Sequence, residues 1–299
     1  MTRTNRFQVV FLVTLGLTVG LFGCDDGATG AGGVGGAGGS AGSSGGVLRI
    51  LVTNDDGIEA PGIDAVVEAL KVDPNNELVV AAPVANRSGS ADSTIETRPA
   101  CGNGDVMPSA TASGYDEATW AVDGCPADCV IYAFENLYPD GLPHVVLSGI
   151  NDSQNVGNVS GALSQISGTV GAAKTAACLG VPALASSQGE GETIDFEAGV
   201  AEVLRWLADN RAALLAGEAP LENITSINIP SCDTGAIRGR VDVPLATDNP
   251  DNEYPLLGPQ DCESTFENPQ NDLEAFFNGY VAVTPVPRNS NTTCDKLEN

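Results

Sequence analysis

The sequence predicts an α/β domain built on a largely parallel β-sheet. Short apolar runs rich in β-branched residues alternate with helical patterns along most of the 299-residue chain. A strand, a helix and a second strand follow one another within residues 47–83, which is typical of a βαβ unit. Hydrophobic residues make up 42% of the chain, enough for a sizeable core. Together these observations indicate the α/β class.

The first βαβ unit is the best defined part of the pattern. Residues 47–53, "VLRILVT", predict a buried strand, and residues 77–83, "ELVVAAP", predict the second one. Pro61 between them suits the first turn of a helix. One face of that helix carries apolar residues at helical spacing, namely Ile63, Val66, Val67 and Leu70.

The same alternation continues toward the C-terminus. Further strands are predicted at 119–124, 143–151, 181–187, 224–230 and 279–286, and further helices at 127–138, 167–180 and 194–215. Gly180 is suited to closing the second of these helices. Residues 231–278 are rich in Pro, Asp and Asn and weakly periodic, so loops are expected there, with or without a hairpin. The chain shows no internal repeat.

The first 23 residues resemble a bacterial lipoprotein signal peptide. Arg3 and Arg6 precede an apolar run of 17 residues, which is too short for a typical transmembrane helix. The run ends in Leu-Phe-Gly before Cys24, which resembles the site where cleavage leaves a lipid-modified cysteine. An ordinary signal peptide or an uncleaved anchor is the simpler alternative. We expect a lipid-anchored protein of the bacterial cell envelope, periplasmic or at the outer surface.

Residues 24–46 predict a flexible tether between that cysteine and a folded domain. Eleven of the 20 residues from 27 to 46 are glycine and none is charged, so the segment cannot bury a core. A chain of this kind has a root-mean-square reach of about 25 Å. The folded domain is therefore expected over residues 47–299.

The charge balance restricts the classes of partner. The chain has 39 acidic and 13 basic residues, a net charge of −26 at pH 7. Such a balance argues against binding a nucleic-acid polymer and against a polybasic membrane contact, since both need clustered Lys and Arg. It leaves a nucleotide ligand open, because a metal ion can reverse the local field.

Cysteine usage agrees with export to an oxidising compartment. Seven cysteines follow Cys24, so at least one of them lacks a partner within the chain. We favour the bridges Cys101–Cys125 and Cys232–Cys262 and expect Cys178, inside an apolar helical pattern, to be a buried free thiol. Zinc is not expected, because the chain has a single histidine and only one closely spaced cysteine pair.

Polar clusters follow several predicted strands at the point where each strand ends. They are Asn54 to Gly57, Asn86 to Gly89, Ser148 to Asn151, and Ser167 to Thr169 at a helix start. In open parallel sheets, ligands bind beyond the carboxyl ends of the strands. Taken singly, each cluster is also explained as a turn, a loop cap or an N-cap. Their shared edge of one sheet favours a ligand site.

The chemistry of these clusters favours a hard cation beside an anion. Two carboxylates, a hydroxyl and an amide carbonyl are oxygen ligands that suit Mg²⁺ or Mn²⁺ better than zinc. A Ser-Gly-Thr sequence at a helix start offers hydroxyls and backbone N–H groups to an anion. A cation next to an anion-binding helix end is what a phosphate ester requires.

Six segments resemble, in order, the motifs of the SurE family of metal-dependent 5′-nucleotidases, the stationary-phase survival proteins. They are "ILVTNDDGIEAPGI", "NRSGS", "GCPADCV", "VVLSGINDSQNVG", "SGTVGAA" and "NGYVAVTP". The resemblance implies a Rossmann-like three-layer αβα sandwich with a largely parallel sheet and an extended C-terminal part. It also implies one Mg²⁺ or Mn²⁺ per subunit and hydrolysis of phosphomonoesters, usually nucleoside 5′- or 3′-monophosphates, with some members acting as broad acid phosphatases.

The resemblance also implies site residues. The metal ligands would be Asp55, Asp56, Ser88 and Asn151. The phosphate would lie among Asn86, Gly89, Asn155, Ser167, Gly168 and Thr169. Asp55 and Asp56 are the candidate catalytic residues, with Asp55 the better candidate for a general base that serves an in-line attack by water. Adjacent aspartates would then coexist because a divalent cation lies against them.

The sequence departs from the family pattern in two places. Residues 158–166, "NVSGALSQI", form a longer loop than the family usually has, so substrate preference is expected to differ. The tail after "VAVTPV" is short, whereas the family often continues with a helix that joins subunits. A homodimer and a monomer therefore both stay open.

Two rival interpretations use the same residues. A phosphatase of the haloacid dehalogenase type would form an aspartyl-phosphate, but it places its two aspartates two residues apart, and here they are adjacent. A tethered lipoprotein that binds phosphate compounds without cleaving them would need no cation. The complete set of metal ligands therefore speaks against this second rival.

Overall fold

The structure is a computed structural model that describes residues 46–158, 163–250, 253–255, 257–290 and 293–297. The predicted signal peptide, Cys24 and the predicted tether up to residue 45 lie outside the described residues, and so do residues 159–162 of the long loop. Among the helices that the structure describes, none combines the length and the apolar character needed to cross a membrane.

A mixed, mostly parallel sheet forms the centre of the domain. Over the described residues its strand order is β3-β4-β2-β1-β5-β6-β7-β9-β8. The strands are β1 (Leu48–Thr53), β2 (Asn76–Pro83), β3 (Val106–Pro108), β4 (Thr119–Val122), β5 (Val145–Asn151), β6 (Ala183–Gln188), β7 (Asn223–Ile229), β8 (Arg240–Asp242) and β9 (Val281–Pro287). The six strands from β4 to β7 run parallel, whereas β3 and β9 pair antiparallel with β4 and β7.

The sheet grows outward in both directions from β1 and β5, its two central strands. β1 connects through β2 toward β4, whereas β5 connects through β6 toward β7. Thr53 of β1 pairs with Ser148 of β5 in parallel register, so both strands end at the same edge. This reversal is the topological switch point at which ligands bind in open α/β sheets.

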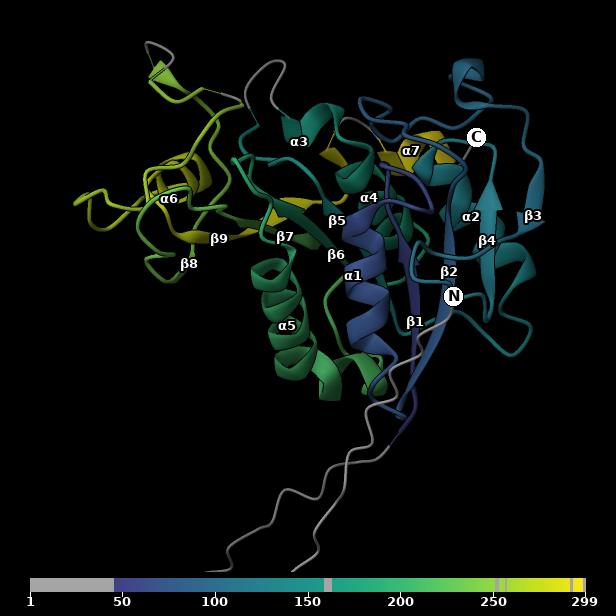
Figure 1. Cartoon of the computed structure of the whole chain (residues 1–299). Coiled ribbons are helices and arrows are strands. Elements are labelled where there is room, and N and C mark those ends of the chain that lie inside the picture. Colours follow the sequence, from purple (N-terminus) through teal and green to yellow (C-terminus); the bar gives the residue numbers. More distant parts are fainter. Residues whose placement is uncertain (1–45, 159–162, 251–252, 256, 291–292, 298–299) are drawn as a thin grey trace, which may run out of the picture. The chain divides into compact units, whose positions relative to one another are not determined.

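Helices cover both faces of the sheet (Figure 1). α1 (Pro61–Leu70) and α5 (Phe196–Ala216) pack on one face through a core that includes Ile63, Val67 and Trp206. α2 (Pro126–Asn136) and α4 (Gly168–Cys178) pack on the other face through a core rich in alanine. The predicted three-layer sandwich is confirmed.

The long regular elements agree with the sequence-based predictions, and the short ones were missed. A 3₁₀ turn at Pro99–Cys101, β3, α3 (Leu163–Ile166) and α7 (Thr293–Leu297) had no prediction. Residues 231–278, expected as loops with or without a hairpin, contain β8 and α6 (Asp272–Phe277), and β8 extends the sheet parallel to β9. These elements are too short to carry a recognisable period.

The C-terminal part has a small core of its own. Val156, Val243, Phe276 and their neighbours form a third cluster of buried apolar residues. Asp272 at the start of α6 is buried, and its carboxylate accepts hydrogen bonds from the backbone N–H groups of Gly157 and Ala246, both at 2.7 Å. The C-terminal part is thereby tied to the loop that follows β5.

Three pairs of cysteine sulfurs lie at bonding distance. Cys101–Cys125 and Cys232–Cys262 are the two pairs that the sequence analysis favoured. The expectation for Cys178 was wrong, because its sulfur lies against that of Cys294, 116 residues later, on the segment of α7. Within the described part of the chain the cysteine left free is Cys129, which is buried in α2.

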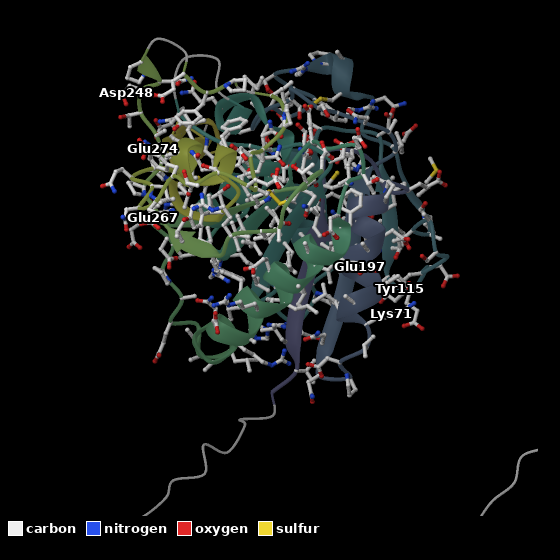
Figure 2. All side chains as sticks on the ribbon, turned by 60° about the vertical axis from the view of Figure 1, so that its left-hand side comes forward. Lys71, Tyr115, Glu197, Asp248, Glu267 and Glu274 are labelled. Atoms are coloured by element: carbon white, nitrogen blue, oxygen red, sulfur yellow. A yellow bond between two sulfur atoms is a disulfide. The ribbon has the colours of Figure 1, made fainter. Side chains whose placement is uncertain are left out.

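Acidic side chains lie on the surface of the C-terminal part. Asp248, Glu267 and Glu274 mark it in Figure 2, at the side where α6 is drawn. Asp248 and Glu267 are exposed, as unpaired carboxylates should be. This surface thus carries part of the excess negative charge seen in the sequence.

Candidate active site

A tight turn after β1 presents the two adjacent aspartates. The side chain of Asn54 holds the turn, since its amide donates to the carbonyl oxygen of Gly57 at 2.9 Å and its Oδ1 accepts from the N–H of Gly57 at 3.2 Å. α1 then starts close to the end of β5, because a Cβ at position 62 would lie 1.8 Å from the carbonyl oxygen of Ile150. Glycine at 62 therefore lets the start of α1 approach the end of β5.

The loop after β2 docks on this turn. The N–H of Arg87 donates to the carbonyl oxygen of Asp55 at 2.6 Å. The side chain of Asn86 donates to Asp56 Oδ1 at 3.2 Å and accepts from the N–H of Ser88 at 2.8 Å. Asn86 therefore links Asp56 to the backbone that carries Ser88.

The start of α4 holds Asp55. Ser167 caps the helix by accepting from the N–H of Val170 at 3.2 Å. The N–H of Gly168 donates to Asp55 Oδ2 at 3.1 Å, and the hydroxyl of Thr169 donates to Asp55 Oδ1. A Cβ at position 168 would lie 2.7 Å from the Cβ of Asp55, so glycine is needed for this approach.

Asn151, at the end of β5, joins the same cluster. Its Oδ1 lies 3.2 Å from the hydroxyl of Thr169, and its Nδ2 donates to the carbonyl oxygen of Ser153 at 2.6 Å. Thr169 is fully buried and lies between the carboxylate of Asp55 and the amide oxygen of Asn151. It is placed to orient two of the predicted metal ligands.

Burial strongly perturbs the two carboxylates. Asp55 is 2% exposed, and burial raises its pKa above the usual range despite the hydrogen bonds it accepts. Burial raises the pKa of Asp56 to about 8, and the neighbouring charges of Asp55 and Asp152 add to the effect. A buried carboxylate next to a half-buried one favours the binding of a proton or a cation over two adjacent negative charges.

A pocket of about 210 Å³ opens beside these residues. Six predicted site residues line it, namely Asp55, Ser88, Gly89, Asn151, Asn155 and Ser167. The other four, Asp56, Asn86, Gly168 and Thr169, are not in its lining but contact residues of the turn, the loop or the helix start that form it. All ten lie in one neighbourhood, and their individual roles remain predictions.

The sequence analysis missed five residues of the lining. Asp152, Ser153 and Gln154 follow Asn151 directly, so their position after β5 was a usable signal. Ile166 and Leu257 also line the pocket, and nothing in the local sequence indicates it. Leu257 comes from the segment expected to be loops, about 90 residues further along the chain.

The donor set fits a hard divalent cation. Asp55, Ser88 and Asn151 supply a carboxylate, a hydroxyl and an amide oxygen to one pocket. The carboxylate of Asp56 accepts from the N–H of Asp152, another lining residue, at 3.2 Å. Over the part of the chain that the structure describes, no three His, Cys, Asp or Glu side chains gather as a metal cluster. Two acidic ligands with neutral oxygens are typical of Mg²⁺ sites that keep several waters.

Loop 151–157, which forms the floor of the pocket, is held by hydrogen bonds to side chains of β6 and β7. Asn228 of β7 is buried; its Oδ1 accepts from the N–H of Asn155 at 2.6 Å and its Nδ2 donates to the carbonyl oxygen of the same residue at 3.3 Å. The side chain of Asn155 donates to Ser187 Oγ at 2.8 Å. With Asp272 at Gly157, these bonds make the floor a rigid element of the fold.

Comparison with known proteins gives a consistent result. The family model described as "Survival protein SurE" matches residues 50–249, a range that contains all ten predicted metal and phosphate residues. The 5′-nucleotidase SurE of Brevibacillus brevis is 34% identical over 259 residues, covering 80% of this chain and 90% of the relative. The 5′-nucleotidase SurE of Hyphomonas neptunium is 31% identical, covering 80% and 92%.

A solved structure supports the same match in three dimensions. The crystal structure of the SurE protein from Aquifex aeolicus superimposes with a TM-score of 0.62 at 29% identity. The match covers 80% of this chain and 93% of that one. The ten predicted metal and phosphate residues and the strands from β2 to β8 lie within residues 50–249, the range that the family model matches.

Proposed function

The chain belongs to the SurE family, and from that premise we propose that it is a metal-dependent phosphomonoesterase acting on nucleoside monophosphates. The observation that carries the proposal is the buried Asp55 beside Ser88 and Asn151 in one pocket, with the half-buried Asp56 next to it in the chain and the pKa of both aspartates raised. The relatives bear the name of an enzyme, so a non-catalytic phosphate-binding lipoprotein is not favoured.

The residues in and around the pocket have three proposed roles: metal binding, orientation of Asp55 and phosphate binding. Asp55, Asp56, Ser88 and Asn151 would hold one Mg²⁺ or Mn²⁺, which when bound supplies a Lewis acid that withdraws charge from the phosphoryl oxygens. Thr169 and Gly168 keep the carboxylate of Asp55 in one orientation. Gly89, Asn155 and Ser167 form the remaining polar wall, against which the phosphate group would bind.

The hydrolytic step needs a proton acceptor in the pocket. Water attacks phosphorus opposite the sugar oxygen and loses a proton, while the phosphorus–oxygen bond to the sugar breaks and the sugar oxygen takes up a proton, so the products are inorganic phosphate and the free nucleoside. Asp55 is the aspartate of the pair that lines the pocket, so we assign the proton to its carboxylate. Thr169, which donates to Asp55 from the buried side, holds that carboxylate in place for the transfer.

A substrate and metal panel tests the proposal directly. Domain 47–299, stripped of metal with a chelator, should release no phosphate from adenosine 5′-monophosphate or 4-nitrophenyl phosphate. Addition of Mg²⁺ or Mn²⁺ should restore turnover with one ion per subunit. Activity that persists in the stripped protein would contradict the metal site. A phosphorylated Asp55 trapped during turnover would favour the aspartyl-phosphate mechanism instead.

We also propose that the enzyme works on the cell envelope, attached through a lipid on Cys24. The apolar N-terminal run, the glycine-rich tether and the three cysteine pairs at bonding distance support this place. Cells fed a labelled fatty acid should incorporate the label into the full chain but not into Cys24→Ser. Equal labelling of both proteins, or none in either, would contradict the anchor.

A further inference from the structure

The pocket has an apolar side that the proposed chemistry does not use. Ile166 is 43% exposed and Leu257 is 49% exposed, and both line the pocket that also contains Asp55 and Ser88. The rest of its lining is polar or glycine. Ligand pockets commonly combine a few placed polar groups with apolar side chains that contact the remainder of the ligand.

Ile166 has a fixed position relative to the phosphate-binding wall. It is the last residue of α3 and directly precedes Ser167, the N-cap of α4. Its carbonyl oxygen accepts from the N–H of Ala91 at 3.0 Å, which ties it to the loop after β2. The side chain of Ile166 is thus held next to the helix start that contacts Asp55.

The segment that carries Leu257 is tied to the pocket floor. The side chain of Gln260 donates to the carbonyl oxygen of Gly258 at 2.7 Å and to that of Glu190 at 3.0 Å. The N–H of Glu190 in turn donates to Gln154 Oε1 at 3.2 Å, and Gln154 lines the pocket. A short chain of hydrogen bonds therefore joins Leu257 to the floor.

A covalent constraint acts on the same segment. Cys262, two residues beyond Gln260, lies at bonding distance from Cys232. Ser231, which directly precedes Cys232, donates its N–H to Gln260 Oε1 at 2.8 Å. The loop that carries Leu257 is therefore held in place by these bonds. The exposed half of the Leu257 side chain contributes no hydrophobic free energy to the stability of the free protein.

We propose that Ile166 and Leu257 form a subsite for the nucleobase of the substrate, and this rests on the proposed phosphomonoesterase function. A base is flat and weakly hydrated, so it gains free energy from contact with two aliphatic side chains, whereas a bare sugar phosphate does not. Leu257 lies beyond residues 50–249, the range that the family model matches, whereas Ile166 lies within it. Because aliphatic side chains offer no hydrogen bonds, the subsite accepts purines and pyrimidines with little discrimination.

A matched pair of substrates isolates the contribution of the base. Adenosine 5′-monophosphate and ribose 5-phosphate carry the same phosphate on the same sugar and differ in the base. Ile166→Ser and Leu257→Ser should each raise KM for the nucleotide by about tenfold, the size expected for losing contact with about two methylene-sized groups. The kcat for the nucleotide should stay unchanged, because the base contacts these side chains equally in the bound substrate and in the transition state. The kcat and KM for ribose 5-phosphate should also stay unchanged, because this ester has no base.

Leu204→Ser is the matched control. Leu204 on α5 is 38% exposed, comparable to the two subsite residues, and lines a groove between α1 and α5. It should leave both substrates unaffected. Equal losses on nucleotide and ribose 5-phosphate, or an unchanged KM for the nucleotide in both subsite variants, would overturn the proposal.

Failure of the proposed function has a different signature. If the wild-type protein with Mn²⁺ hydrolyses neither ester, the function fails, and calorimetry then decides the subsite. Adenosine 5′-monophosphate should still bind about tenfold more tightly than ribose 5-phosphate, and Leu257→Ser should remove that difference. Equal affinity of the wild-type protein for the two esters would refute the subsite.

Discussion

Asp56→Asn and Asp55→Asn should each lower kcat by about a hundred- to a thousandfold, the usual cost of losing one preorganised charge at a reacting centre. The substitutions keep the size of the side chain, so folding should be retained. The variants should also lose the increase in thermal stability that Mn²⁺ gives the wild-type protein. Steady-state kinetics and thermal unfolding with and without Mn²⁺ measure both effects, and normal turnover by Asp56→Asn would refute the metal assignment.

In the metal-free protein, Asp56→Asn should change the dependence of stability on pH. The pKa of Asp56 rises from 3.8 to about 8 on folding, so the folded protein binds this proton more tightly than the unfolded chain does. Stability without metal should therefore fall as pH rises from about 4 to about 8, and Asp56→Asn should reduce that fall. Unfolding by urea in a chelator across this pH range tests the sign.

Thr169 provides an independent check that ligand orientation matters. Thr169→Val removes the hydroxyl that donates to Asp55 but keeps the branched shape, and should weaken Mn²⁺ binding by about ten- to a hundredfold. Thr169→Ser keeps the hydroxyl and should bind Mn²⁺ almost normally. Calorimetric titration distinguishes the two, and equal affinities would exclude an orienting role for the hydroxyl.

Lys174→Met should lower the free energy of unfolding by about 3 kcal/mol, because it leaves a buried carboxylate without its charged partner. The Nζ of Lys174 lies 3.8 Å from Asp92 Oδ2, and both side chains are at most 4% exposed. Nζ also donates to the carbonyl oxygen of Ser290. Methionine preserves the volume, so the loss reports on the charge and its hydrogen bonds rather than on a cavity.

An exposed ion pair supplies the control for this prediction. Glu68 of α1 and Lys71, which follows the helix directly, form an ion pair whose side chains are 36% and 40% exposed. Lys71 lies at the surface near Tyr115 in Figure 2. Lys71→Met should cost less than about 0.5 kcal/mol. The double variant Lys174→Met with Asp92→Asn should recover part of the loss. Equal costs for the two single lysine variants in urea unfolding would contradict the prediction.

The sequence by itself determined the regular part of the fold and the neighbourhood of the site. The longer strands and helices, such as β1, α1 and α5, are predicted by local sequence patterns, because each carries apolar residues at the spacing of its own secondary structure. The polar residues after β1, β2 and β5 are brought together by parallel strand order alone, since those strands end at one edge. Asp55, Ser88 and Asn151 therefore meet as the strand pattern predicted.

Only the tertiary structure decided the features that depend on contacts between distant segments. Cys178 pairs with Cys294 rather than staying free, and α6 forms where Asp272 can bind the backbone of Gly157, 115 residues away. Thr169 supports Asp55 instead of facing the pocket, and Leu257 reaches the pocket from the C-terminal part. None of these positions has a local signal, because the free energy that selects each one comes from partners far away in the chain.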